Sequence, residues 1–203
     1  MNFTLTRTAQ ITGLILLAAA ITQAIYTALY MSEADVPRQL LWGTEGFLVV
    51  MLAAFAGSAM SQAISHHLAW SAITAAAILN VVQVGVGLTM FGPFFEASGE
   101  VEALTPAARS VVAFSFMVYN AAKILLALAL IVFGFARLSE GSKLLGGACV
   151  AIGAVALVSN AVSMGAGRNV FGDLPLAGGS GVLATIMLAV CLLTLQEPAR
   201  KAP

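Results

Sequence analysis

The chain has 203 residues, of which 60% are hydrophobic and only 9% are charged, and its mean hydropathy is +0.98. These values exclude an ordinary soluble globular domain and predict a membrane protein that crosses the bilayer several times. Nine Lys and Arg residues balance nine Asp and Glu residues, which argues against a nucleic-acid partner or a polybasic lipid-binding patch.

Six apolar segments can be drawn along the chain, each close to the ~20 residues that a helix needs to cross a bilayer. Polar connections rich in turn-forming residues separate them. We therefore predict an all-α polytopic membrane bundle of six transmembrane helices that forms one integral membrane domain over residues 1–203. The segments run over residues 9–31, 40–62, 69–92, 109–136, 144–167 and 177–196.

The first segment follows Arg7 and begins like a secretory signal peptide. Its apolar run extends well past the three alanines at 18–20, where cleavage would be expected. We therefore interpret it as a retained first span that also directs insertion into the membrane.

The cationic residues in the connections predict the orientation, because cytoplasmic loops carry an excess of Lys and Arg. The side that holds both termini has five cations, whereas the other side has three cations and six acidic residues. Both termini are therefore expected in the cytoplasm. The first side carries Arg7, Arg137, Lys143, Arg200 and Lys201, and the second carries Arg38, Arg109 and Arg168 with Glu33, Asp35, Glu96, Glu100, Glu102 and Asp173.

The longest connection on the second side covers residues 92–108 and contains Phe94 and Phe95, which three glutamates follow. Two alternatives remain open for it, an irregular loop and a short helix lying at the membrane interface.

An internal repeat relates the third and fifth segments. Six of the thirteen residues from 80 to 92 are identical to those found 80 positions later, beginning with Asn80 and Asn160. Such a match indicates either a duplicated helical hairpin or two helices that independently need glycines for close packing. The other matched pairs are Val82/Val162, Gly85/Gly165, Gly87/Gly167, Phe91/Phe171 and Gly92/Gly172.

Small residues recur at intervals of four in two other segments. Ala53, Gly57 and Ser61 share one helix face, and Gly147 and Ala151 share another. In lipid, faces of this kind usually pack against a neighbouring helix, so they predict a compact bundle.

A lysine lies at the centre of the fourth segment. Lys123 is 14 residues from both Arg109 and Arg137, which puts it about 21 Å from either end of a helix. A lysine side chain cannot reach the membrane surface over that distance. Because an isolated charge in hydrocarbon is costly, Lys123 needs a partner, a hydrated cavity or deprotonation, and it marks the candidate functional site.

Other polar residues fall inside the predicted spans, most of them in the half of the membrane away from the termini. Tyr119, Asn120 and Lys123 share one helix face, and Gln23 and Tyr26 of the first segment lie at a similar depth. A polar cavity open to the non-cytoplasmic side would satisfy this layer. The residues predicted to bind a ligand there are Lys123, Asn120, Glu45, Gln83, Asn80, Asn160 and Tyr119.

Glu45 is the acidic residue within the predicted spans and is the natural counter-charge for Lys123. It lies only about 8 Å into its helix, so the two depths match poorly. A direct ion pair therefore competes with a purely structural arrangement, in which Lys123 bonds to Asn120, Tyr119 and amides of neighbouring helices.

Recognisable catalytic and metal-binding patterns are missing from the sequence. His66 and His67 are adjacent, so they cannot clamp a haem from two helices, and they are interpreted as solvated turn residues or contacts to lipid headgroups. Cys149 and Cys191 are too few and too far apart in sequence for a redox motif, and are interpreted as packing residues. We expect no cofactor and no metal.

Three stretches resemble a known family: R-x-A-x-I-x-G-L-I-L over 7–16, E-G-F over 45–47, and the run from residue 129 to 161 through the fourth and fifth segments. Together they resemble a bacterial family of six-helix integral membrane proteins that is described as a domain of unknown function. The resemblance implies a six-span fold in a bacterial inner membrane, and it implies no activity and no site residues.

Two classes of function remain open. The bundle is expected to be a small-solute or proton transporter or receptor whose polar cavity holds a small-molecule ligand, or alternatively a non-catalytic assembly or partner subunit. A lipid-modifying enzyme is a distant third, because no general base or metal set is recognisable. Homo- and hetero-oligomers are both compatible with the sequence.

Overall fold

The computed structural model describes residues 4–32, 34, 36–167, 169–172 and 174–195 of the chain. Several charges used to predict the orientation lie outside these described residues, namely Glu33, Asp35, Arg168, Asp173, Arg200 and Lys201.

The described residues form six α-helices and contain no strand, which confirms the predicted all-α six-helix membrane bundle. Each helix is long and apolar enough to cross a membrane. In hydrocarbon a helix satisfies every internal backbone hydrogen bond by itself, which is why such apolar segments become helices. The helices are α1 (Leu5–Met31), α2 (Arg38–Gln62), α3 (His67–Glu100), α4 (Thr105–Ser139), α5 (Lys143–Ala166) and α6 (Leu176–Leu193).

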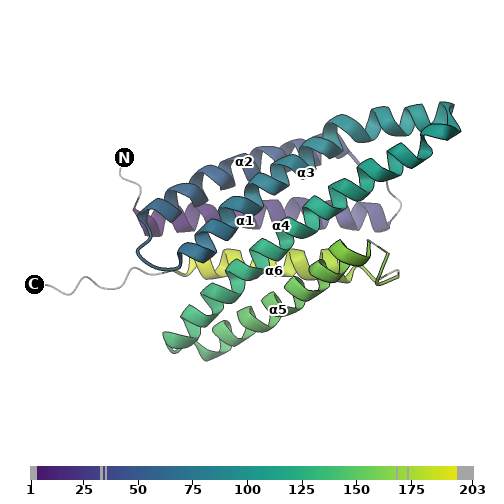
Figure 1. Ribbon diagram of the computed structural model, residues 1–203. Helices are drawn as coiled ribbons and strands as arrows, with labels where there is room; N and C mark the ends of the chain where they lie inside the picture. The colour runs from purple at the N-terminus through teal and green to yellow at the C-terminus, as the bar shows by residue number, and fades with distance from the viewer. Residues whose placement is uncertain (1–3, 33, 35, 168, 173, 196–203) are drawn as a thin grey trace, which may run out of the picture.

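The connection expected over residues 92–108 is largely helical. Helix α3 continues through Pro93 to Glu100, a short 3-10 turn (η1, Glu102–Leu104) follows, and α4 begins at Thr105. An internal proline removes one backbone hydrogen bond and bends a helix without necessarily ending it, and α3 bends along this stretch (Figure 1). The separate interfacial helix is therefore replaced by a hairpin of α3 and α4 that projects beyond the other helices (Figure 1).

Five of the helices surround the centre of the bundle in the order α1, α2, α3, α4 and α6, and α6 packs back against α1. Helix α5 packs outside this ring, against α4 and α6. We call the end at which α1 begins and α6 ends the proximal end, and the opposite end, at which α2, α4 and α6 begin, the distal end (Figure 1).

The closest helix packing lies between α4 and α5. A Cβ placed on Gly146 would lie 2.8 Å from the carbonyl oxygen of Gly134, and one placed on Gly153 would lie 3.1 Å from that of Ala127. Gly147, by contrast, has no such neighbour within 4 Å. The face predicted from Gly147 and Ala151 is therefore wrong by one position, since the neighbouring face makes the contact.

The packing face predicted on α2 is confirmed in part, because Ala53 packs against the buried core and Gly57 faces Thr74 of α3. The buried residues of this helix include Val49, Leu52, Ala56 and Ala59, whereas Ser61 is exposed. Alanine thus allows close approach here, and the nearest contact that a Cβ on Gly57 would make is an ordinary one of 3.9 Å.

Candidate functional site

Three side chains form a hydrogen-bonded chain across the centre of the ring. Nζ of Lys123 donates to Oε1 of Gln23 at 2.6 Å, and Nε2 of the same Gln23 amide donates to Oε1 of Glu45 at 2.5 Å. The three residues come from α4, α1 and α2. Because α1 and α4 do not pack directly against each other, the long lysine side chain bridges the interior between them.

Lys123 is enclosed by protein, with 1% of its surface exposed. Its Nζ also donates to Oγ1 of Thr185 on α6 at 3.2 Å and lies 5.2 Å from the centre of the Tyr119 ring. Its aliphatic stem lies against Gly181, where a Cβ would come within 3.0 Å of Cγ and Cδ. Lys123 therefore has the polar partners that an intramembrane cation requires.

The predicted alternatives for Lys123 are resolved by the position of Gln23. Glu45 and Lys123 do not form a direct ion pair, because the Gln23 amide lies between them and bonds to both. The uneven depths of the two charges explain this arrangement, since an amide extends the reach of the lysine toward the glutamate. Of the expected structural partners, Tyr119 contacts the ammonium, whereas Asn120 donates instead to Oγ of Ser163 at 3.3 Å.

A cavity of about 600 Å³ lies on the distal side of the hydrogen-bonded chain formed by Lys123, Gln23 and Glu45. Glu45 and Gln23 contribute to its wall, and Asn169, Phe171 and Pro175 of the α5–α6 connection line it as well. Its volume falls in the usual range of small-molecule sites. The other described lining residues are Tyr26, Thr27, Arg38, Trp42, Gln83, Phe91, Phe95, Val112, Ser115, Phe116, Tyr119, Asn120, Ser163, Gly172, Leu174, Leu176, Ala177 and Gly178.

The structure brings together some of the predicted ligand-binding residues and separates others. Glu45, Gln83, Tyr119 and Asn120 line the cavity, and Lys123 lies behind Gln23 and Tyr119 without lining it. These placements agree with the expected polar cavity in the half of the bundle away from the termini.

The two asparagines of the sequence repeat lie outside the cavity. Asn160 is fully buried beside Lys123 and Gly181, and its amide donates to the carbonyl of Ala177 at 3.0 Å. Asn80 is also buried, and among the described residues the side-chain oxygen of each asparagine has no hydrogen-bond partner.

The glycines of the repeat play different parts in the two helices. Gly87 lies inside α3 against the Trp42 ring, where a Cβ would be 2.7 Å from a ring carbon, whereas Gly167 ends α5 with a φ of 95°. Only glycine adopts such a φ readily. The duplication stays a prediction.

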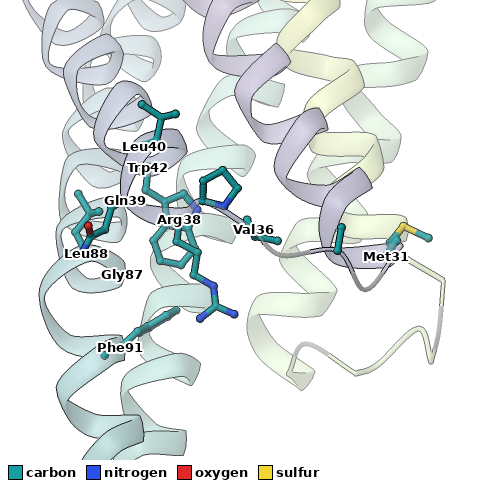
Figure 2. Close-up of a pocket in the computed structure, with 12 residues that line it drawn as sticks. Met31, Val36, Arg38, Gln39, Leu40, Trp42, Gly87, Leu88 and Phe91 are labelled. Carbon is teal, nitrogen blue, oxygen red and sulfur yellow. The ribbon is translucent and has the colours of Figure 1, made fainter.

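Aromatic residues form one wall of the cavity. The ring centres of Tyr26 and Trp42 are 5.3 Å apart, those of Trp42 and Phe91 are 5.6 Å apart, and those of Phe91 and Phe95 are 6.0 Å apart. A larger, shallower groove of about 1160 Å³ shares Arg38, Trp42 and Phe91 with the cavity. Figure 2 shows this groove between the α1–α2 connection and α3, with the Arg38 guanidinium extending toward Phe91.

Sequence reasoning placed Gln23 in the polar layer but missed its bridging role, and it missed Thr185, Ser163 and Gly181 altogether. Single hydroxyl groups and glycines are common in membrane helices, where the hydroxyl bonds to its own helix; Thr185 indeed also donates to the carbonyl of Gly181. Only the neighbourhood of Lys123 distinguishes these residues, and a single sequence does not contain that information.

The two cysteines lie together although they are 42 positions apart. The Sγ atoms of Cys149 on α5 and Cys191 on α6 are 3.2 Å apart, and both residues are buried. His66 and His67 lie at the turn between α2 and α3, and the His66 ring is near that of Phe133, with 5.7 Å between ring centres. No group of three metal-ligating side chains occurs within the described part of the chain.

Comparison with known proteins finds no matching family model, and neither the curated proteins nor the solved structures include one with detectable similarity. The resemblance to a six-helix bacterial membrane family therefore stays a prediction, and the function is inferred from the geometry of the site.

Proposed function

We propose that the protein is a small-solute transporter or receptor of a bacterial inner membrane, and that its solute binds in the distal cavity. One observation carries the proposal: a cavity of about 600 Å³ reaches the Glu45 end of a buried chain of polar side chains. Interhelical hydrogen bonds in membranes contribute only about 0.6 kcal/mol each on average. Stability alone is therefore a weak reason to bury a lysine and a glutamate in the middle of the bundle.

The experiment is a thermal-unfolding screen of the purified protein against a panel of small solutes. A ligand that binds the folded state raises the unfolding temperature according to its concentration relative to Kd. Ser115→Trp should abolish the response, because Ser115 is 3% exposed and lines the cavity, so a large ring would fill it. The matched control is Ser110→Trp on the exposed part of the same helix. A response that survives Ser115→Trp would place the site elsewhere.

The alternative role of an assembly subunit is supported by one other feature. The α3–α4 hairpin extends beyond the bundle (Figure 1) and exposes Phe95, Val101 and Leu104, with relative exposures of 49%, 49% and 42%. Such apolar side chains are typical of surfaces that contact another protein or the lipid headgroup region. If no solute raises the unfolding temperature, the shortening of this hairpin should be tested next for its effect on assembly.

We also propose that the proximal end faces the cytoplasm. Among the described residues, Arg7, Arg137 and Lys143 lie at this end with one acidic residue, Glu140, whereas the distal end carries Glu96, Glu100 and Glu102 besides Arg38 and Arg109. This distribution agrees with the excess of cations in cytoplasmic connections. The cavity would then open to the outside of the cytoplasmic membrane.

A further inference from the structure

We propose that the solute of the distal cavity is a small organic cation with an apolar body, and that its binding releases the proton of Lys123. This inference rests on the proposed binding function and specifies the chemical class of the solute and its coupling to protons. Three features support it, namely the charge of the lining, its aromatic rings and the charge balance of the buried chain.

The carboxylate of Glu45 is the anionic group among the described lining residues. Gln23 bonds to its Oε1, and among the described residues Oε2 has no hydrogen-bond partner. Glu45 is 5% exposed in a wall of the cavity. Because a buried carboxylate is favoured by any added cation or donor, the open Oε2 is a suitable contact for an ammonium group.

Aromatic rings line the same cavity as Glu45. Trp42 precedes Glu45 by three residues on the same face of α2, its ring is 5.3 Å from that of Tyr26, and Tyr119 lines the cavity from α4. The faces of such rings attract cations. The protein already uses this interaction, since the Lys123 ammonium lies 5.2 Å from the Tyr119 ring centre.

The charged groups in the lining disfavour an anion. The ammonium of Lys123 is enclosed behind Gln23 and Tyr119, so a solute in the cavity does not meet it. Arg38 lies seven residues before Glu45, which places it about 10 Å nearer the distal end of α2. It is exposed there, so solvent and salt screen its charge.

The charge balance of the hydrogen-bonded chain from Glu45 through Gln23 to Lys123 explains why cation binding would release the Lys123 proton. Glu45 on α2 and Lys123 on α4 compensate each other through Gln23, and the nearby titratable groups are Tyr26 on α1 and Tyr119 on α4. The described spans of α3, α5 and α6 carry no other charged group facing Lys123. A second cation at Glu45 would leave a net positive charge in a medium of low dielectric constant.

Loss of the Lys123 proton restores neutrality. The ammonium becomes an amine, the proton passes to bulk water, and the solute cation becomes the partner of Glu45. One cation enters for each proton that leaves. The Kd of the cation should therefore fall about tenfold for each unit by which the pH rises, over the range in which Lys123 is protonated in the free protein.

The test uses matched series of amines, alcohols and carboxylic acids with the same apolar body, for example benzylammonium, benzyl alcohol and benzoate. Binding is measured by calorimetry at several pH values and in buffers of different ionisation enthalpy, which gives the number of protons released by the wild-type protein. We expect the amines to bind preferentially, and about one proton to appear per cation bound.

Two substitutions at Lys123 should have different effects on amine binding. Lys123→Arg keeps a permanent positive charge, because arginine does not deprotonate in proteins, so amine binding should weaken at least tenfold and proton release should stop. Lys123→Met removes the competing cation, so amine binding at neutral pH should be as tight as in the wild type or tighter. The same two substitutions at exposed Lys143 are the controls and should change neither quantity.

The possible results separate this inference from the function on which it rests. Preferential binding of the alcohols or the acids would overturn the assignment of a cation but retain a solute site. Amine binding without proton release, or equal weakening by both Lys123 variants, would overturn the coupling. Binding of no member of any series would overturn both the inference and the proposed function.

Discussion

The contact between α4 and α5 provides a quantitative test of the fold, through the substitution Gly146→Ala. A Cβ at Gly146 would lie 2.8 Å from the Gly134 carbonyl oxygen and 2.8 Å from the Leu138 backbone nitrogen. These are backbone atoms, which cannot rotate away as a side chain can, so the two helices must separate. Overpacking of this kind costs about 1–3 kcal/mol.

The adjacent Gly147→Ala is a matched control, because no atom beyond its own stretch of α5 lies within 4 Å of its would-be Cβ. Replacing Gly by Ala inside a helix gains about 1 kcal/mol of helix propensity. That gain is common to both variants, so it cancels in their difference. Gly146→Ala should therefore be less stable than Gly147→Ala by about 2 kcal/mol, which changes the ratio of folded to unfolded protein by a factor of roughly 30.

The assay is reversible unfolding by sodium dodecyl sulfate in mixed micelles, followed by tryptophan fluorescence and circular dichroism. The comparison needs only the difference between the two variants, measured under identical micelle conditions. Equal stability of Gly146→Ala and Gly147→Ala would refute the reasoning, because it would mean that the backbones of α4 and α5 are not in contact at this position.

Three further predictions concern other parts of the bundle. Iodine, which enters membranes, should oxidise Cys149 and Cys191 to an intramolecular disulfide with loss of two hydrogens, because their Sγ atoms are 3.2 Å apart; mass spectrometry that finds two free thiols after treatment would contradict this contact. Arg137→Met should lower the free energy of unfolding by about 1.5 kcal/mol, because the guanidinium donates to the carbonyl of Cys191 at the end of α6; unchanged detergent unfolding would show that this bond contributes nothing. On a background without native cysteines, Ser98→Cys at the distal end should react with a membrane-impermeant maleimide added to intact cells, whereas Ser142→Cys at the proximal end should not; the reverse labelling pattern would invert the proposed orientation.

The sequence was sufficient to predict the helices because the bilayer leaves an apolar chain few alternatives. It failed at residues 92–108 because proline, glycines and glutamates favour a loop by composition. A helix tolerates one missing backbone bond at Pro93 when its neighbours continue in helical geometry, and α3 therefore extends to Glu100. The length of the α3–α4 hairpin could not be predicted from hydropathy, which measures the membrane-spanning part alone.

The site was predicted only in part, for a similar physical reason. A lysine in the middle of an apolar segment stands out, and so does Glu45, because intramembrane charges are costly. Which helices lie beside each other is not encoded in the period of one helix, so Thr185 on α6 and the bridging position of Gln23 remained hidden. The packing glycines show the same limit, since Gly146 and Gly147 fit small-residue patterns equally well and only the neighbouring helix distinguishes them.

The amide of Gln23 explains how one arrangement could serve two protonation states. An amide is both a donor and an acceptor, so it can bond to a carboxylate on one side and to a lysine on the other. A neutral lysine amine still carries N–H groups that can donate to Oε1 of Gln23 and to Oγ1 of Thr185. The hydrogen bonds around Lys123 would therefore survive loss of its proton, and only the electrostatic field at Glu45 would change. A direct Glu45–Lys123 ion pair would bring the ammonium to the carboxylate at which we propose that the solute binds, whereas the bridged chain keeps Oε2 of Glu45 available for a ligand.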